Sequence, residues 1–266
     1  MFSIDSYRLT GKRAIVCGST QGIGRACALA LANLGASVTL AARNESALKA
    51  VLAELPATAG QAHGFIVADF NDPQQVRERV AENIVTAGTA HILVNNSGGP
   101  PAGAILAANP ADFLAAINRH LICNHLLAQA VIPGMKAAGY GRIINIISTS
   151  VREPIPGLGV SNTTRCAVAS WAKTLSREVA PFGITVNNIL PGATETGRIQ
   201  DLINNKARST GQTPEQVRAE MIGHIPAGRF AHPDETAAAT AFLASPAASY
   251  ITGVSLPVDG GRIACI

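Results

Sequence analysis

Short apolar runs alternate along the chain with longer segments in which apolar residues recur at helical spacing. The apolar runs predict strands over 13–17, 37–41, 64–68, 91–95, 142–148, 185–190 and 255–258. The longer segments predict helices over 23–34, 45–55, 73–87, 110–138, 161–180 and 234–243. Strand and helix therefore follow each other in regular alternation from the first strand almost to the end of the chain.

This alternation decides the expected fold class. Strands separated by helices pair in parallel through crossovers, and strands that are apolar throughout are buried on both faces. We expect an α/β fold with one doubly wound, Rossmann-type parallel sheet of about seven strands and helices on both faces. No linker divides the sequence, so residues 1–266 are predicted to form a single domain. Residues 196–230 are polar with little apolar periodicity and are predicted to be an excursion that covers a substrate site.

Composition and charge narrow the possible partners. Of the 266 residues, 47% are hydrophobic and 14% are charged, which favours a large packed core. The net charge of +4 is spread without a basic run, which argues against nucleic-acid binding. No apolar stretch approaches the ~18 residues that span a bilayer, and no signal-peptide pattern is visible, so we expect a cytoplasmic protein without a membrane partner. The five cysteines form no Cys-x-x-Cys pair and are expected to be buried free thiols.

A glycine-rich turn follows the first predicted strand. It reads Gly18-Ser19-Thr20-Gln21-Gly22-Ile23-Gly24 and leads directly into a helix. Glycines at such a turn let the backbone approach a pyrophosphate, and the unpaired N–H groups at the helix N-terminus favour negative charge. A glycine cluster alone is a weak signal, but its place between the first strand and the first helix predicts dinucleotide binding.

Beyond this turn, the chain resembles the short-chain dehydrogenase/reductase family from about residue 9 to residue 261. The resemblance rests on the glycine spacing, on Asn95-Asn96-Ser97-Gly98, on Pro191-Gly192 with Thr196, and on the closing segments 250–253 and 258–261. It implies that Asp69 contacts the adenine, that Asn95 lies beside the adenosine ribose and that Thr196 meets the nicotinamide or its phosphate. The cofactor-binding residues expected from the turn and the resemblance are Gly18, Ser19, Thr20, Gln21, Gly22, Ile23, Gly24, Arg43, Asp69, Phe70, Asn95, Ser97, Gly98, Pro191, Gly192, Thr194 and Thr196.

The end of the second predicted strand indicates which dinucleotide is used. A carboxylate there would bind the ribose 2′-hydroxyl of NAD, whereas an arginine suits the 2′-phosphate of NADP. The chain has Ala42-Arg43 and no acid, which favours NADP with NAD as the alternative. Gln21 weighs against NADP, because many NADP-using relatives have a basic residue in that loop. The alternative interpretation of Arg43 is a surface arginine at the start of the next helix.

The catalytic residues that the resemblance implies are only partly present. The family uses an Asn, a Ser, and a Tyr-x-x-x-Lys pair. Alignment on the segments at 142–148 and 173–178 places Ser148 on the catalytic serine, Ser161 on the tyrosine, Arg165 on the lysine and His120 on the asparagine. The three tyrosines of the chain, Tyr7, Tyr140 and Tyr250, all stand at positions from which they cannot substitute.

Loss of the tyrosine removes the usual proton donor, because a serine hydroxyl is a far weaker acid than a phenol. His120 is the candidate replacement, since an unperturbed imidazole titrates near neutrality; the alternative is a structural histidine. Arg165 is expected to bind an anionic group or the ribose, or to stabilise an oxyanion; the alternative is a surface ion pair. Ser161 fits equally a simple helix N-cap.

Three functions remain open at this point. The first is an oxidoreductase that transfers hydride between NADP(H) and a small carbonyl or alcohol substrate, which Arg165 suggests is anionic. The second is a catalytically impaired nucleotide-binding protein with a regulatory or structural role. The third is non-redox chemistry, such as isomerisation or elimination, on a tightly held cofactor. The resemblance also implies a homo-oligomer, a tetramer or a dimer, and no metal site is expected because the histidines lack metal-ligand spacing.

Overall fold

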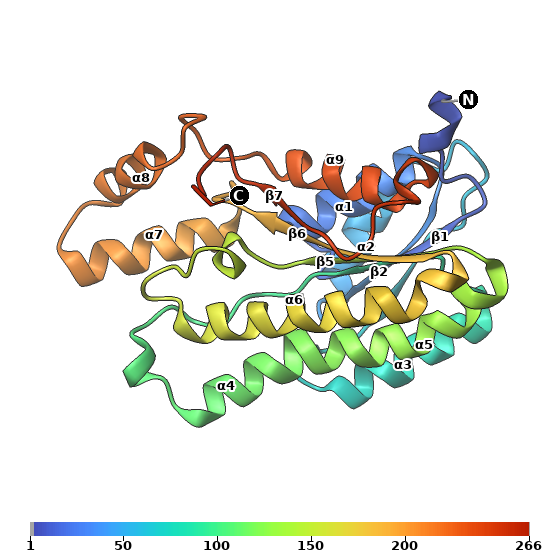
Figure 1. Cartoon of the computed structure of the whole chain (residues 1–266), viewed down its shortest axis with the longest axis horizontal. Coiled ribbons are helices and arrows are strands. Elements are labelled where there is room, and N and C mark those ends of the chain that lie inside the picture. The colour runs from blue at the N-terminus through green and yellow to red at the C-terminus, as the bar shows by residue number, and fades with distance from the viewer. Residues whose placement is uncertain (1–2, 266) are drawn as a thin grey trace.

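The computed structural model describes residues 3–265. A seven-stranded parallel sheet in the order β3-β2-β1-β4-β5-β6-β7 forms its centre (Figure 1). The strands are β1 (Arg13–Cys17), β2 (Ser37–Ala42), β3 (Gly64–Val67), β4 (Ile92–Asn95), β5 (Gly141–Ile146), β6 (Ile184–Pro191) and β7 (Ser255–Val258). The predicted fold class is confirmed.

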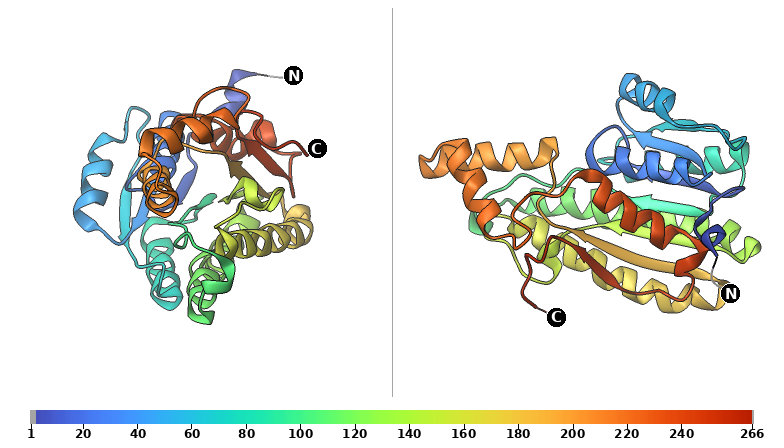
Figure 2. Two further views of the ribbon diagram at one scale, coloured as in Figure 1. Left: turned by 90° about the vertical axis from the view of Figure 1, so that its left-hand side faces the viewer. Right: turned by 90° about the horizontal axis from the view of Figure 1, so that it is seen from above.

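Helices cover both faces of the sheet (Figures 1 and 2). They are α1 (Gly22–Asn33), α2 (Glu45–Glu54), α3 (Pro73–Ala87), α4 (Pro110–Ile117), α5 (Cys123–Ala138), α6 (Gly159–Val179), α7 (Gly197–Thr210), α8 (Pro214–Gly223) and α9 (Pro233–Ala244). One hydrophobic core lies between the sheet and α1, α2 and α9, and a second lies between the sheet and α3, α5 and α6. The β1, β4, β5 and β6 strands are almost wholly buried, as continuous apolar runs predict.

The sheet order changes direction between β1 and β4. The chain moves outward from β1 to β3, then returns to the other side of β1 and continues to β7. In such sheets, ligands bind where the two directions part, at the carboxyl ends of the strands. The fold therefore brings the loops that follow β1, β4, β5 and β6 to one end of the sheet.

The long helix predicted over 110–138 is interrupted. α4 ends at Ile117, a π-helical turn (η3) spans Asn118–Ile122, and α5 begins at Cys123. Hydrophobic periodicity cannot report one widened turn, because the apolar residues on either side keep their helical spacing. Such turns are rare and are frequent at functional sites. Here the turn carries His120, which is only 2% exposed.

The excursion predicted over residues 196–230 contains two helices that the sequence did not predict. The segment forms α7 and α8, and these helices share a small core of their own. Ile199, Ile203 and Ala207 follow at helical spacing on one side of α7 and pack with Val217 and Phe230. The few apolar residues were too widely spread among polar ones for the period to stand out. Both helices extend beyond the end of the sheet (Figure 1).

The prediction of buried thiols holds for three of the five cysteines. Cys17, Cys27 and Cys123 are buried, whereas Cys166 on α6 and Cys265 near the end of the chain are exposed. Burial raises the pKa of the Cys27 thiol to about 12, so this group stays protonated at neutral pH and is not a nucleophile.

Candidate active site

The glycine turn after β1 is built by close backbone approaches. Gly18 has a φ of +58°, and a Cβ there would lie 2.7 Å from the carbonyl oxygen of Asn96. A Cβ on Gly24 would lie 2.1 Å from the carbonyl oxygen of Gly18. The Asn96 side chain donates to the carbonyls of Cys17 and Gly18 and so ties the turn to the end of β4. Glycine is required at these two positions because any side chain would collide with backbone.

The amino end of α1 is open for a ligand. Gln21 is the N-cap residue, but its side chain makes no capping hydrogen bond, so the first N–H groups of α1 keep their capacity to bind phosphate. Gly22 has a φ of +53°, and a Cβ on it would lie 3.0 Å from the Thr196 Cγ2. The turn after β1 and the segment after β6 therefore meet, as a site for one dinucleotide requires. These residues fit NADP(H), with the phosphates on the turn and on the N-terminus of α1.

Two predicted cofactor residues have side chains that serve the protein itself. Ser19 is fully buried, and its hydroxyl accepts a hydrogen bond of 3.0 Å from the Ala41 N–H of β2. Asn95 is 2% exposed, and its amide donates to the Asn145 Oδ1 at 2.8 Å. Any contact of Ser19 with the cofactor is left to its backbone. The Asn95 Oδ1 is buried without a hydrogen-bond partner, so this side chain faces into the sheet.

Asn95 begins a row of hydrogen-bonded amides that crosses the sheet. Asn145 on β5 donates to the Asn188 Oδ1 on β6 at 2.9 Å, and Asn188 donates to the Ser255 hydroxyl on β7 at 3.1 Å. These four residues are direct partners in the strand register. Such a hydrogen-bonded polar row fixes the register of four strands beneath the site, with the Asn95 Oδ1 as its one unpartnered atom among those described. The isolated asparagines in the sequence gave no sign that they form one network.

The remaining predicted cofactor residues lie around the same end of the sheet. Arg43 directly follows β2 and is exposed, as a 2′-phosphate ligand would be. The Asp69 carboxylate accepts from Asn71, and the Phe70 ring packs against the second core. Gly192 approaches Asp259 so closely that a Cβ would lie 2.7 Å from its Cα. Predicted cofactor residues from the carboxyl ends of five strands therefore lie at one end of the sheet. Besides those described above, they are Thr20, Ile23, Asp69, Phe70, Gly98, Pro191, Gly192, Thr194 and Thr196.

Ser148 and Ser161 both lie in loop-to-helix transitions at this end. Ser148 caps the short 3-10 turn η4 (Thr149–Val151), and its hydroxyl accepts from the Ser150 N–H at 3.1 Å. Its O–H remains free to donate. Ser161 is in the first turn of α6, which begins at Gly159 with Leu158 as N-cap, so the N-cap interpretation of Ser161 is wrong. The Ser161 side chain is half-buried and makes no hydrogen bond within residues 3–265.

Arg165 is one helical turn beyond Ser161 on the same face of α6. The side chain is 8% exposed and donates from Nη1 to the Ile146 carbonyl at 3.0 Å, two residues before Ser148. Its Nε is buried without a partner, and no carboxylate pairs with it in the described chain, which excludes the ion-pair alternative. Burial and the nearby Arg198 and Arg119 lower its pKa to about 10, so it remains protonated at neutral pH.

His120 is hydrogen-bonded to Ser97, which lies in the loop after β4. The Ser97 hydroxyl and the His120 Nδ1 are 2.7 Å apart, and the Nε2 is buried without a partner. Burial, followed by the charges of Arg165 and Arg119, lowers the pKa of His120 to about 2. The imidazole is therefore neutral at pH 7, which argues against the predicted role as proton donor. The pairing with Ser97 was not visible in the sequence, because the two residues belong to different elements.

None of the tyrosines reaches this end of the sheet among the residues described. Tyr140 precedes β5, whereas Ser148 follows it, so the length of the strand separates them. The Tyr140 hydroxyl donates to the Ala244 carbonyl at 2.6 Å. Tyr250 is fully exposed in the segment before β7, and the Tyr7 ring contacts Phe242 on α9. The structure agrees with the sequence that no phenol replaces the missing catalytic tyrosine.

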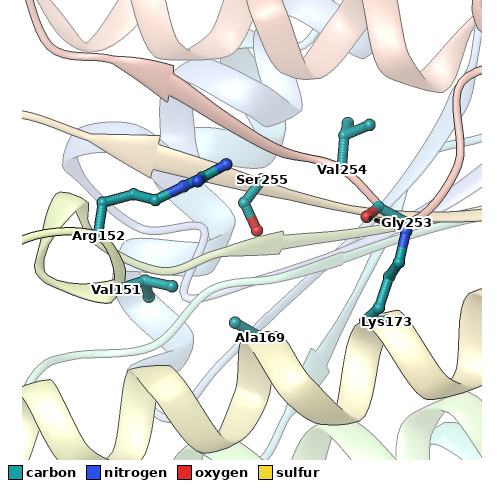
Figure 3. A pocket seen from close by; sticks show the side chains of 7 residues that line it. All are labelled: Val151, Arg152, Ala169, Lys173, Gly253, Val254 and Ser255. Atoms are coloured by element: carbon teal, nitrogen blue, oxygen red, sulfur yellow. Dashed lines mark hydrogen bonds between the residues drawn. The ribbon is translucent and has the colours of Figure 1, made fainter. Parts of the chain in front are cut away.

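Two hollows open on the surface near these elements. One, of about 440 Å³, lies between α7, the π turn and the loop after β4; its lining includes Arg119, Arg198 and Arg208. The other, of about 490 Å³, lies between α6, η4 and β7 (Figure 3). Lys173 crosses its edge and donates to the Gly253 carbonyl at 3.1 Å. Neither hollow has a predicted site residue in its lining.

Residues 3–265 contain neither a membrane-spanning helix nor a cluster of metal ligands. No helix there is long and apolar enough to cross a bilayer. No group of three or more His, Cys, Asp or Glu side chains is arranged to hold a metal ion in this part of the chain.

Comparison with known proteins gives consistent matches. Residues 18–262 match the family profile described as enoyl-(acyl carrier protein) reductase. The chain is 33% identical over 255 residues to a 3-oxoacyl-(acyl-carrier-protein) reductase of Pseudomonas aeruginosa, covering 95% of this chain and 98% of that protein. L-Sorbose reductase from Gluconobacter frateurii, solved with NADPH and L-sorbose, has a TM-score of 0.91 at 31% identity and covers 98% of this chain and 100% of its own. Gluconate 5-dehydrogenase from Burkholderia cenocepacia, solved with NADP and tartrate, has a TM-score of 0.87 at 32% identity, with coverages of 98% and 99%.

Proposed function

This chain belongs to the short-chain dehydrogenase/reductase family, and from that premise we propose that it is an oxidoreductase that transfers hydride between NADP(H) and a small carbonyl or alcohol substrate. The carbonyl or alcohol group of the substrate is expected to lie at Ser148, Ser161 and Arg165. The observation that carries the proposal is the buried guanidinium of Arg165, which is anchored to the Ile146 carbonyl, two residues before Ser148, and keeps an unpartnered Nε. Nucleotide binding without catalysis does not require a buried cation at this place. A reaction that develops negative charge on oxygen does, because the cation stabilises that charge.

NADP(H) is the cofactor that the residues support. The glycine turn and the open N-terminus of α1 suit the pyrophosphate, and exposed Arg43 suits the 2′-phosphate. Related solved structures carry NADPH or NADP. When bound, this cofactor supplies the hydride for reduction of the carbonyl carbon and, as NADP, accepts it in the reverse direction.

Ser148 and Arg165 act on the reacting oxygen. The Ser148 oxygen accepts a hydrogen bond from the Ser150 N–H, which leaves its own O–H to donate to the substrate carbonyl. Arg165 supplies a fixed positive charge in a water-poor place, where it stabilises the oxyanion that forms as hydride arrives. The product oxygen then takes its proton from water that reaches the half-buried Ser148 and Ser161 hydroxyls. The charge of the site also favours a substrate with an anionic group.

His120 has a positioning role in this scheme. Its neutral ring bonds to Ser97 and holds the turn after β4 against the π turn. Loss of a general acid costs typically ~10² to 10⁴ in rate, so we expect turnover to be slower than in relatives that keep the tyrosine.

The test follows the hydride itself. NADPH deuterated at the transferred position is incubated with purified protein and a panel of oxo acids and neutral ketones, and label in the alcohol product is measured by mass spectrometry. Label above background in the wild type, and its loss in Ser148→Ala but not in Ser170→Ala on the exposed face of α6, supports the proposal. Tight NADPH binding without label in any product would instead support the catalytically impaired alternative.

A revertant separates a missing acid from a damaged scaffold. Ser161→Tyr combined with Arg165→Lys restores the family pair. A gain of ordinary ketone reduction in this double variant shows that the cofactor and substrate sites are sound. No gain would mean that the surrounding residues have also diverged from the ordinary chemistry.

We also propose that the chain forms a homo-oligomer, a tetramer or a dimer. β7 is one of the two edge strands of the sheet, and the segment before it exposes Tyr250 and Val254. Light scattering on the purified protein tests this directly. The cytoplasmic location and the single domain over residues 1–266, with a substrate-covering excursion, remain predictions.

A further inference from the structure

The hollow beside α7 is lined by three arginines, none of which forms an ion pair within the described chain. Arg119 comes from the π turn, and Arg198 and Arg208 come from α7. On the same side of the molecule, Arg218 pairs with Glu195 and Arg229 pairs with Glu235. Arginines near the hollow are thus left without acids, while arginines close by are paired.

The lining of the hollow is otherwise polar and short of negative charge. Asn204 and Asn205 contribute amides, and Gly99 and Pro101 form the wall from the loop after β4. Asp201 is the one acid of the lining, against three guanidinium groups. The lining therefore has an excess of positive charge and of hydrogen-bond donors, which suits an oxyanion.

Two of the three arginines, Arg119 and Arg198, are held by backbone carbonyls, whereas Arg208 is exposed and donates to the Asn205 side chain. Arg198 donates from Nη2 to the Pro100 carbonyl at 2.6 Å. Arg119 donates from Nη1 to the Gly98 carbonyl at 3.3 Å, and its Nε donates to the side chain of Asn71 at 3.1 Å. Neutral acceptors orient a guanidinium without cancelling its charge. Arg119 and Arg198 are thus oriented at the hollow, and Arg208 adds an exposed positive charge to its lining.

Keeping these charges together costs free energy when nothing balances them. Partial burial lowers the pKa of Arg198, although the charge of Asp201 raises it, and burial followed by the charges of Arg198 and Arg119 lowers the pKa of Arg165. Like charges destabilise one another more strongly where water is scarce. An anion that enters the hollow would relieve this repulsion, so binding and local stability are coupled.

The position of the hollow points to the substrate rather than to the cofactor. The cofactor turn meets α7 at its N-cap, Thr196, whereas the lining continues along α7 to Arg208. Ten residues separate Arg198 from Arg208, which corresponds to ~15 Å along a helix. At about 440 Å³ the hollow is larger than a lone carboxylate needs and lies within the ~300 to 1,000 Å³ of ligand pockets.

We propose that this hollow binds the anionic end, a carboxylate or a phosphate, of a substrate whose carbonyl or alcohol group lies at Ser148. The assignment rests on the proposed function for the identity of the ligand as substrate. The proposed substrate is therefore an extended polar compound whose carboxylate or phosphate is remote from the reacting carbon. Arg119, Arg198 and Arg208 are the residues that select it.

Binding is tested first, without turnover. Malonate and inorganic phosphate are titrated by calorimetry into protein saturated with NADPH, with glycerol as the neutral probe. We expect both anions but not glycerol to bind, and Arg198→Gln and Arg208→Gln each to weaken anion binding about tenfold through loss of a charged donor. The matched control is Arg79→Gln on α3, which removes an equal charge from a surface pair with Glu82.

Three outcomes overturn the assignment. The first is anion binding that is unchanged in both α7 variants, and the second is anion binding that falls equally in Arg79→Gln. The third, seen by repeating the titration without NADPH, is phosphate binding that occurs only in the absence of NADPH, which would assign the hollow to the cofactor. Because Arg198 also supports the loop after β4, Arg198→Lys serves as a second variant; it keeps the charge and should retain most of the binding.

Turnover then separates this assignment from the proposed function. With oxo acids, oxo phosphates and neutral ketones of matched length, Arg208→Gln should raise KM about tenfold for the anionic compounds only and leave kcat unchanged. The two anionic series decide between carboxylate and phosphate. Equal kinetics on neutral and anionic compounds would overturn the substrate assignment, while the hydride transfer itself would stand. Absence of turnover on every compound would overturn the proposed function and, with it, the identification of the anion as substrate.

Discussion

A buried arginine lies at each end of the parallel sheet, and the two arginines differ in how many of their N–H donors have a hydrogen-bond partner. Arg142 on β5 is 2% exposed and donates to the carbonyls of Gly141, Gly183 and Ser245, at 2.8, 3.2 and 3.4 Å. Its guanidinium also lies over the Tyr140 ring, 4.1 Å from the centroid. Arg165 at the opposite end has one carbonyl partner and a buried Nε without any.

The difference shows that burial alone does not identify a functional residue. Both side chains are charged, deeply placed and without a carboxylate partner in the described residues. Arg142 finds its acceptors within the fold, so its donors are used by the protein. Arg165 keeps donors unused at the end of the sheet where the cofactor turn lies. Unused hydrogen-bonding capacity at a buried cation indicates a ligand or a transition state that uses it.

Replacing each arginine by methionine should have opposite effects on activity and on stability. Arg165→Met should lower kcat/KM by ~10² to 10³, because a charge aimed at the reacting oxygen is lost. The folded protein should keep its stability or gain some, since an unbalanced buried charge is replaced by an apolar side chain of similar length. Steady-state kinetics and thermal unfolding measure both quantities. Arg177→Met, in the exposed last turn of the same helix, is the control and should change neither. An Arg165→Met variant that unfolds readily but keeps its activity per folded molecule would make Arg165 structural.

Arg142→Met should do the reverse. Three carbonyls near the amino end of β5 would lose their donor, and we expect the free energy of unfolding to fall by ~2 to 4 kcal/mol. kcat should stay unchanged for the folded fraction, because the residue is separated from Ser148 by the length of β5. Denaturant unfolding followed by assays at low temperature separates the two effects. A fall in kcat without a fall in stability would contradict this division of roles.

The contrast also explains which parts of the molecule the sequence could predict. The strands, the glycine turn and the alignment of Ser148, Ser161 and Arg165 depend on local runs and short motifs, which the printed chain displays directly. The π turn at His120, the bond from Ser97 to His120 and the amide row from Asn95 to Ser255 depend on contacts between distant elements. No pattern within one segment encodes such contacts. The helices over 197–223 were missed because a small local core needs only a few apolar residues.

His120 gives a pH test of the active end. Its pKa of about 2 in the folded protein is lower than the ~6.5 of an unfolded histidine. As pH falls below 6.5, the unfolded chain gains a proton that the folded chain does not take up, so stability falls by up to ~1.4 kcal/mol per pH unit. His120→Asn should lack this part of the slope between pH 6 and pH 4, as measured by urea unfolding, and the background from other groups cancels in the difference.

The same residue should leave no mark on the kinetics near neutrality. Because the ring is neutral throughout, the kcat of the wild type should show no ionisation of His120 between pH 6 and pH 8. A kinetic pKa in that range that disappears in His120→Asn would return the histidine to the role of proton donor. It would also mean that bound substrate raises the pKa of the ring, as an anion near Arg165 and Arg119 would do by balancing their charges.

The smallest effect is expected at Tyr140, which completes the structural end. Tyr140→Phe keeps the ring beneath Arg142 and over Lys12 but loses the 2.6 Å hydrogen bond to the Ala244 carbonyl. One neutral hydrogen bond contributes ~0.5 to 1.5 kcal/mol, so the free energy of unfolding should fall by about 1 kcal/mol. Tyr250→Phe is the control, because that side chain is fully exposed and its loss of a hydroxyl should have no effect. If Tyr140→Phe were as destabilising as Arg142→Met, the hydroxyl rather than the guanidinium would hold this end together. A change in kcat in Tyr140→Phe would show that the two ends of β5 are coupled, and Arg142 could then no longer serve as the inert counterpart of Arg165.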